Sequence, residues 1–176
     1  NEIEFPFLAG PVKVDPLARL RLSGFSRGPD GARFRAIPGI GLRASTNFHR
    51  TYDVASGPLD LRGLRHIITP ELDYRFDFAN NVDPGELYPV DAVEAADEYH
   101  RLAVGLRNRL QTIRKVGGKD ALVDVLDADI DARFFPDPDR DNFGSRTTIH
   151  EEITIHPRTW WRIYSRGDFQ GSGEGR

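Results

Sequence analysis

The chain has 176 residues, of which 39% are hydrophobic and 29% charged, and its formal net charge at pH 7 is −3. No apolar stretch approaches the roughly 20 residues of a membrane-spanning helix, which excludes a helical membrane protein, and the charge balance argues against nucleic-acid binding. The sequence contains no cysteine, which excludes disulfides, thiolate metal ligands and a cysteine nucleophile within these residues. Because it contains no methionine and begins at Asn1, we expect a processed chain or a fragment of a longer one.

Apolar and polar residues alternate along most of the chain, which is the pattern of β-strands whose two faces differ chemically. In residues 34–48, for example, Phe34 and Leu42 share one face, whereas Arg35 and Arg43 share the other. The alternation predicts about seven strands, at residues 19–23, 34–48, 65–78, 102–111, 121–134, 149–156 and 159–169.

Turn-forming residues separate the predicted strands and favour antiparallel hairpins over crossover helices. They lie at residues 28–31, 55–58, 117–118 and 136–139, and at Pro157. The sequence shows no domain boundary, so we interpret residues 1–176 as one segment.

The connection at 79–98 is longer than the others, acidic, and without Lys or Arg. We expect a solvated loop there, with a short helix at 90–99. The hairpin order places this loop and the 136–145 connection on one side of the sheet. The 115–119 and 157–158 turns then lie on the other side.

The predicted strands exceed the five or six residues usual in globular proteins, and several match or exceed the roughly 9 to 11 residues of a tilted strand crossing a bilayer. Their polar faces are ionic: Arg107 and Arg109 on one strand neighbour Asp127, Asp129 and Asp131 on the next, and such charges pair across a ladder. We therefore expect an all-β fold of antiparallel up-and-down strands that forms part of a large outer-membrane β-barrel, with apolar faces toward lipid and ionic faces toward water. Aromatic residues near the strand ends fit its interfacial girdles, namely Phe48, Tyr52, Phe78, Tyr99, Phe134, Phe135, Trp160 and Trp161.

Several stretches resemble one known protein family. They are residues 8–14, 41–46, 105–111 and, most specifically, 64–71 (Leu-Arg-His-Ile-Ile-Thr-Pro-Glu), which Tyr74 follows. Over nearly the whole chain, the sequence is similar to the lipopolysaccharide-assembly outer-membrane barrel. The resemblance implies an internal piece of that barrel, without the periplasmic jelly-roll domain that precedes it in the family.

The resemblance also implies a function. Members of this family receive lipopolysaccharide from periplasmic bridge proteins and insert it into the outer leaflet of the outer membrane of Gram-negative-type bacteria, and a lipoprotein plugs their barrel. For this chain we accordingly expect lipopolysaccharide transport in the outer membrane, without enzymatic activity and without a cofactor. The expected partners are lipopolysaccharide, the plug lipoprotein, the bridge proteins and membrane lipid, with no nucleic acid.

Arginines on the polar faces are the candidate ligands of lipopolysaccharide, because guanidinium groups bind phosphate and carboxylate oxygens in a bidentate manner. Salt bridges to acidic residues on neighbouring strands are an equally good interpretation of each arginine. The candidate residues that line the interior or contact lipopolysaccharide are Arg33, Arg35, Arg43, Glu71, Asp73, Arg75, Arg107, Arg109, Asp127, Asp129 and Asp131.

Two groups of residues have weak metal-binding patterns. Asp137, Asp139 and Asp141 have the spacing that opens a calcium loop, but Asn142 and Thr148 occupy the positions of the required Gly and Glu, so a solvated turn is favoured. The residues His150, Glu152 and His156 share one strand face, where polar residues facing the interior are favoured over a metal site.

Other functional classes remain open as alternatives. Asp127, Asp129 and Asp131 would suit acid/base catalysis only with further partners, so a charge-compensated wall is favoured. A general or substrate-specific porin is the first alternative function. A soluble sugar-binding β-sandwich, in which the apolar faces pack against a second sheet, is the other.

Overall fold

The computed structural model describes residues 1–25, 31–82, 99–141 and 144–171. Within these ranges the chain forms ten β-strands and one helical turn, α1 (Pro138–Asp141). The strands are β1 (Glu2–Glu4), β2 (Phe7–Ala9), β3 (Val12–Phe25), β4 (Arg33–Ser45), β5 (Phe48–Ser56), β6 (Leu61–Asp77), β7 (His100–Val116), β8 (Lys119–Phe134), β9 (Thr147–Arg158) and β10 (Trp161–Gln170).

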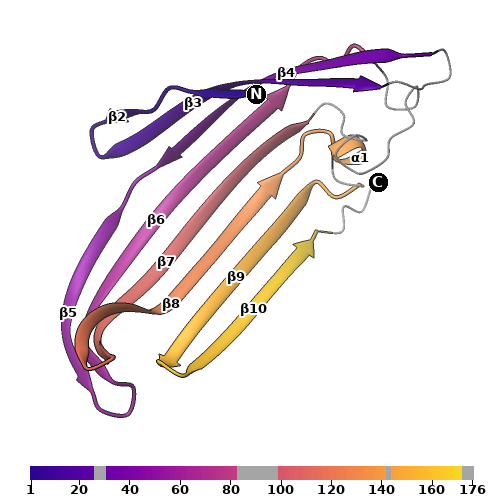
Figure 1. Cartoon of the computed structure of the whole chain (residues 1–176). Coiled ribbons are helices and arrows are strands. Elements are labelled where there is room, and N and C mark those ends of the chain that lie inside the picture. Colours follow the sequence, from indigo (N-terminus) through magenta and orange to yellow (C-terminus); the bar gives the residue numbers. More distant parts are fainter. Residues whose placement is uncertain (26–30, 83–98, 142–143, 172–176) are drawn as a thin grey trace.

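The strands form a single antiparallel sheet in the order β1-β3-β4-β6-β7-β8-β9-β10, with β2 paired to β3 and β5 paired to β6. Figure 1 shows this sheet as an open, curved layer of long strands. The expected all-β, antiparallel, up-and-down architecture is therefore confirmed.

The two ends of the sheet differ. The tight turns that join β5 to β6, β7 to β8 and β9 to β10 lie at one end, which we name the turn end (lower in Figure 1). The strand ends that flank the 79–98 and 136–145 connections lie with α1 at the other, which we name the loop end. This confirms the predicted division of long and short connections between two sides.

The two faces of the sheet also differ, as the alternation predicts. Apolar side chains of one face are exposed: the exposed fraction is 48% for Leu22, 50% for Ile40 and 47% for Val104. A β-sandwich would cover this face with a second sheet, but the described strands form only one. No helix in the described ranges is long and apolar enough to cross a membrane.

Three strands were not expected from the sequence. Residues 2–9 lack a clean alternation, yet they line up along β3 with Glu4 opposite Leu17 and Phe7 opposite Val14. β5 was predicted as the end of one strand followed by a turn, but it pairs with β6 over its own length. Backbone pairing with a neighbour, rather than side-chain pattern, therefore defines these three strands.

The turn at 117–118 was predicted correctly, whereas the turn predicted at 55–58 lies at 57–60, because β5 continues to Ser56. Gly117 and Gly118 both have positive φ (58° and 81°), as a two-residue hairpin requires. The turn predicted at 157–158 was wrong, because β9 continues to Arg158. Pro157 lies beyond the last β8–β9 pair and beside a β9–β10 bulge, so its missing N–H removes no regular ladder bond.

Three further predictions fall partly or wholly outside the described residues. The 28–31 turn falls almost entirely in residues 26–30, which are not described. Most of the 79–98 loop and the 90–99 helix fall in residues 83–98, which are likewise not described.

Pro70 marks the point where one neighbour of β6 replaces another. β4 pairs with β6 up to Ser45 opposite Glu71, and β5 pairs with it from Phe48 opposite Ile68. Pro70 lies in the gap and cannot donate a ladder hydrogen bond, since proline has no N–H. Its carbonyl instead accepts a hydrogen bond from the Thr46 N–H at 3.3 Å. β4 and β5 therefore pair with consecutive parts of the same edge of β6, with a break between them at residues 46–47.

A buried arginine on β7 links the β5–β6 turn to the end of β9 at the turn end of the sheet. The side chain of Arg114 on β7 is 1% exposed, and its guanidinium donates to the carbonyls of Leu59, Asp60, His156 and Pro157 at 2.9 to 3.3 Å. These carbonyls belong to the β5–β6 turn and to the end of β9, which β7 and β8 separate in the sheet order.

Candidate functional site

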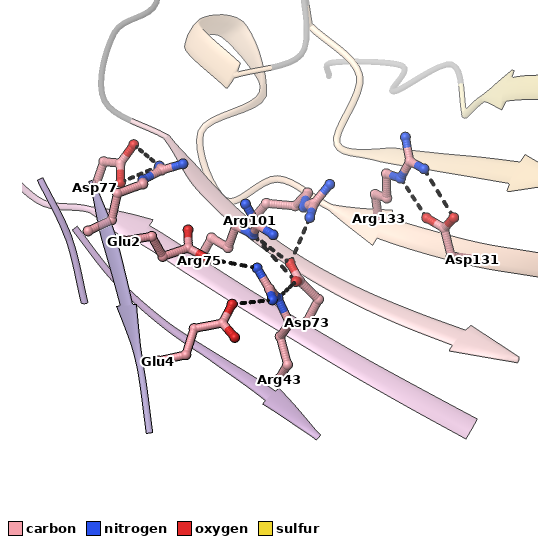
Figure 2. A network of polar contacts seen from close by, with 10 residues as sticks. Glu2, Glu4, Arg43, Asp73, Arg75, Asp77, Arg101, Asp131 and Arg133 are labelled. Atoms are coloured by element: carbon pink, nitrogen blue, oxygen red, sulfur yellow. Dashed lines mark hydrogen bonds and ion pairs between the residues drawn. The ribbon is translucent and has the colours of Figure 1, made fainter. Parts of the chain in front are cut away.

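Ion pairs cover the polar face of the sheet near the loop end (Figure 2). The carboxylate of Asp73 on β6 lies 2.6 Å from Arg101 Nη2, 3.2 Å from Arg75 Nε and 3.3 Å from Arg43 Nε. Three guanidinium groups on three neighbouring strands therefore share one acid.

Arg43 extends this network to the N-terminal strand. Its two remaining nitrogens contact Glu4 at 2.8 Å and Glu2 at 3.1 Å, both on β1 beyond β3 (Figure 2). Arg43, Arg75 and Asp73 were candidate ligand residues, and the structure instead engages all three in contacts within the sheet.

A glycine allows an ion pair to form across a whole strand. Arg19 on β3 and Asp77 on β6 both lie opposite Gly39 of the intervening β4, and Arg19 Nη2 lies 2.6 Å from Asp77 Oδ1. A Cβ atom on Gly39 would lie 2.0 Å from Asp77 Oδ1 and 3.1 Å from the Phe76 carbonyl oxygen. Only glycine leaves space for this buried carboxylate.

The predicted charge pairing between β7 and β8 is present, but its partners lie on the diagonal. The ladder sets Arg107 opposite Asp129, whereas its guanidinium binds Asp127 in a bidentate manner at 3.0 and 2.8 Å. Arg109 is more loosely held, since its Nε lies 3.8 Å from Asp127 and 4.0 Å from Asp124. Asp131 pairs along its own strand with Arg133 (Figure 2).

A hollow of about 450 Å³ opens on the polar face beside the break between β4 and β5. We name it the basic hollow. Its lining contains three arginines, one histidine, several neutral polar side chains and one carboxylate. The residues are Ser45, Asn47, His49, Arg65, Ile67, Thr69, Glu71, Arg107 and Arg109.

Hydrogen-bond donors outnumber acceptors in the basic hollow. Arg65 is exposed and makes no ion pair or hydrogen bond with any described residue, and the contacts of Arg109 are long. Among the described residues of the lining, Glu71 is the only carboxylate, and Thr69 already donates its hydroxyl to Asn47 Oδ1 at 2.6 Å. Guanidinium groups in this arrangement are suited to binding the oxygens of a phosphate or carboxylate.

Acidic hollows adjoin the basic one. A hollow of about 180 Å³ over Gly105 is lined by Glu71, Asp73, Asp129 and Asp131 together with two arginines. A third, of about 330 Å³, has Asp124, Asp127, Asp129 and Glu152 in its lining. The polar face is therefore a mosaic, in which the basic hollow carries more positive than negative side chains and the two hollows beside it carry more negative than positive ones.

The structure brings together only part of the predicted site. Glu71, Arg107 and Arg109 lie together in the basic hollow. Arg35 was expected to face the water-filled interior, but it is 1% exposed, with its guanidinium 5.2 Å from the centre of the Phe25 ring. The side chain of Arg33 lies outside the described part of the chain.

Six members of the basic hollow were not among the predicted site residues: Ser45, Asn47, His49, Arg65, Ile67 and Thr69. Arg65 shares its strand face with Thr69 and Glu71, so the alternation could have placed it there. The alternation of the predicted strand at 34–48 likewise puts Asn47 and His49 on the polar face, but it could not show that the strand breaks after Ser45 and that a hollow opens there.

Of the three aspartates of the 136–145 connection, Asp137 and Asp139 are exposed, whereas Asp141 has a structural role. Asp141 does not face solvent as a solvated turn would require: its buried carboxylate accepts the His100 N–H at 3.3 Å and pairs with Arg140 Nε at 2.7 Å. Among the described residues, no group of three or more His, Asp or Glu side chains is arranged to hold a metal ion. On the predicted strand face of β9, His150 pairs with Asp168 at 2.7 Å.

The aromatic residues fall into two sets. Phe48, Tyr52, Phe78, Phe134, Trp160 and Trp161 are exposed. Tyr99 and Phe135 instead pack edge to face at the loop end, with ring centres 6.2 Å apart, which does not fit the expected girdle position. Burial raises the pKa of the Tyr99 hydroxyl, so this ring remains a neutral phenol.

Comparisons with protein-family models, with curated proteins and with solved structures find no match for the chain.

Proposed function

We propose that the chain is a membrane-spanning segment of an outer-membrane barrel that transports lipopolysaccharide and inserts it into the outer leaflet. The observation that carries this proposal is the contrast between the two faces of one sheet: an apolar, exposed face and a polar, ion-paired face that contains the basic hollow. The resemblance of residues 64–71 and their neighbours to the lipopolysaccharide-assembly barrel agrees with it.

Lipid is the environment that best fits the exposed face. Exposed apolar side chains recur on β3, β4, β7, β8 and β9, and a soluble monomer rarely leaves so continuous an apolar surface in water. Long antiparallel strands satisfy one another's backbone groups, which a hydrocarbon environment demands. In a closed barrel, the polar face would surround water.

The basic hollow gives the transported molecule a place of contact. Lipopolysaccharide carries phosphates and acidic sugars, and of the three arginines that line the hollow, Arg65 and Arg109 have weaker contacts inside the sheet than Arg107. The acidic hollows nearby would keep such a ligand from being held along the whole face. By resemblance, a plug lipoprotein, periplasmic bridge proteins and membrane lipid are the partners of the full-length protein.

The transport proposal is tested by Arg65→Gln and Arg109→Gln in the full-length protein, measured as lipopolysaccharide at the cell surface. We expect the double variant to lower surface lipopolysaccharide several-fold. Arg21→Gln is the matched control, because Arg21 lies on the polar face of β3 outside the hollow and makes no ion pair with a described residue. Unchanged surface lipopolysaccharide with an altered single-channel conductance would favour a porin.

The membrane placement has its own test. Single cysteines at Val104 and Ile130, on the exposed face, are labelled with a fluorophore in the full-length protein reconstituted with brominated lipids. We expect strong quenching at both positions and weak quenching at a control cysteine that replaces Thr69 in the hollow. Equal quenching at all three would contradict the assignment of the faces.

A further inference from the structure

The exposed apolar face carries one group of polar side chains at the turn end. On β5 and β6, His49, Arg65 and Ile67 line the basic hollow, so their neighbours Arg50 and His66 lie on the opposite, apolar face. Tyr52 and Asn108 share that face, since they follow the same alternation on β5 and β7. We name Arg50, Tyr52, His66 and Asn108 the outward polar cluster.

The members of this cluster contact one another. Arg50 lies opposite His66 in the β5–β6 ladder, and its guanidinium is 5.2 Å from the centre of the Tyr52 ring. His66 Nε2 lies 3.3 Å from Asn108 Oδ1 across β6 and β7. The cluster is therefore continuous over three strands.

The surroundings of the cluster are apolar and contain no acid paired with it. Phe48, Ile68 and Leu110 are its neighbours on the same face. Arg50 is exposed, and no described carboxylate lies within ion-pair distance of its guanidinium. A charged donor without an acceptor is costly in hydrocarbon, by an amount that falls sharply toward the membrane–water interface.

The tryptophans place the cluster close to that interface. The ladder pairs connect Arg50 through His66, Leu110, Leu126 and Ile155 to Ile163 of β10. Two residues before Ile163 is Trp161, and Trp160 beside it is 81% exposed. Tryptophan prefers the level of lipid headgroups, and the two tryptophans and the cluster both lie toward the turn end, so the cluster is on the side of the sheet nearest that interface.

We propose that the outward polar cluster binds the phosphate of an anionic phospholipid in the leaflet that contacts the turn end. Arg50 supplies the charge, Tyr52 and His66 can add hydrogen bonds, and the arginine side chain is long enough to extend toward the headgroups. This inference rests on the proposed membrane placement, but it concerns a lipid held outside the sheet and not the lipid transported along the polar face.

The test uses the full-length protein reconstituted in vesicles of phosphatidylcholine with a graded fraction of phosphatidylglycerol. Phosphatidylglycerol that remains bound after transfer to detergent is counted by native mass spectrometry. We expect Arg50→Gln to weaken phosphatidylglycerol retention about five-fold or more, and Arg50→Lys to weaken it less. Arg21→Gln removes a guanidinium from the polar face and is expected to leave retention unchanged.

Two results would overturn the inference. One is equal retention by the unmodified protein and Arg50→Gln, and the other is an equal loss in Arg50→Gln and Arg21→Gln. Tyr52→Phe keeps the ring beneath Arg50 and serves as the second variant if Arg50→Gln does not fold; unaltered retention in it would also count against the cluster. If the label at position 104 is quenched by brominated lipid but Arg50→Gln retains phosphatidylglycerol normally, only this inference is refuted. If the label at position 104 is not quenched, the membrane placement on which the inference rests is refuted.

Discussion

At the residue scale, glycine in this sheet makes room for ion pairs. Gly39 lies directly between Arg19 and Asp77, which meet over its missing side chain. Gly105 lies between Glu71 and Asp131, two acids that form no ion pair, and a Cβ atom there would be 3.5 Å from the nearest atom, the Asp131 Cβ. Both glycines lie in the middle of the sheet between two charged residues, but only Gly39 is crowded by a side chain that reaches over it.

Gly39→Ala is therefore expected to destabilise the sheet by about 1 to 3 kcal/mol, because the buried Asp77 carboxylate must move away from its arginine. Gly105→Ala is expected to change stability by about 0.5 kcal/mol or less. The measurement is the urea-unfolding midpoint of the full-length protein in detergent micelles. Equal effects of the two substitutions would show that the Arg19–Asp77 contact does not depend on the glycine.

The candidate site could be predicted only where a residue's face decided its role. The alternation correctly placed Glu71, Arg107 and Arg109 on the polar face, where they meet in the basic hollow. The alternation could not show that Arg43 and Arg75 form ion pairs with Asp73, because these contacts depend on how the side chains lie on the sheet and on which strands become neighbours. The length of the side chains and the register between strands determine these contacts, and neither can be deduced from the alternation of apolar and polar residues.

At the scale of elements, sequence and structure agree best for strands that are paired on both sides. β4, β6, β7 and β8 carry long alternating runs because each contributes to both the apolar and the polar face of the sheet along most of its length. β1, β2 and β5 are short and exposed throughout, so little burial imposes a pattern on them. Pro70 cannot donate a ladder hydrogen bond, and it lies where β5 replaces β4 beside β6.

The turn end depends on an interaction among three hairpins. Arg114 has five donors in a planar fork and uses them on four carbonyls from two separate segments. A lysine ammonium carries the same charge on one atom and cannot reach both segments in this way.

Arg114→Lys is accordingly expected to lower the free energy of unfolding by about 2 kcal/mol or more, since a buried carbonyl left without a donor costs roughly 1 to 3 kcal/mol. Arg158→Lys is the matched control, because Arg158 makes one such bond, to the Gly57 carbonyl at 3.0 Å. We expect a change of about 0.5 kcal/mol or less there. Thermal unfolding of the full-length protein in micelles compares the two, and an equal effect would contradict the special role of Arg114.

At the scale of the whole molecule, the sheet is one layer with an uncovered apolar face and open outer strands. Its described core is small: Phe25 and Val82 form the buried hydrophobic cluster, near the loop end. Such a layer is not expected to be stable by itself in water, because both the face and the strand edges promote association.

The isolated chain of 176 residues is therefore expected to aggregate in buffer without detergent and to remain dispersed in micelles with its β-structure intact. Size-exclusion chromatography with light scattering and circular dichroism would measure this. A monomeric product that unfolds cooperatively without detergent would contradict the membrane placement and favour a soluble protein.

The contacts of Arg114 also determine what a shortened chain would lose. Gly57 and Arg158 are 101 positions apart along the polypeptide, yet Arg158 donates a hydrogen bond to the Gly57 carbonyl beside this arginine. Each hairpin joins segments that are neighbours in sequence, whereas these contacts need both the β5–β6 turn and the end of β9. A chain that ended before His156 would keep the pairing within its earlier hairpins but lose every bond from Arg114 to β9.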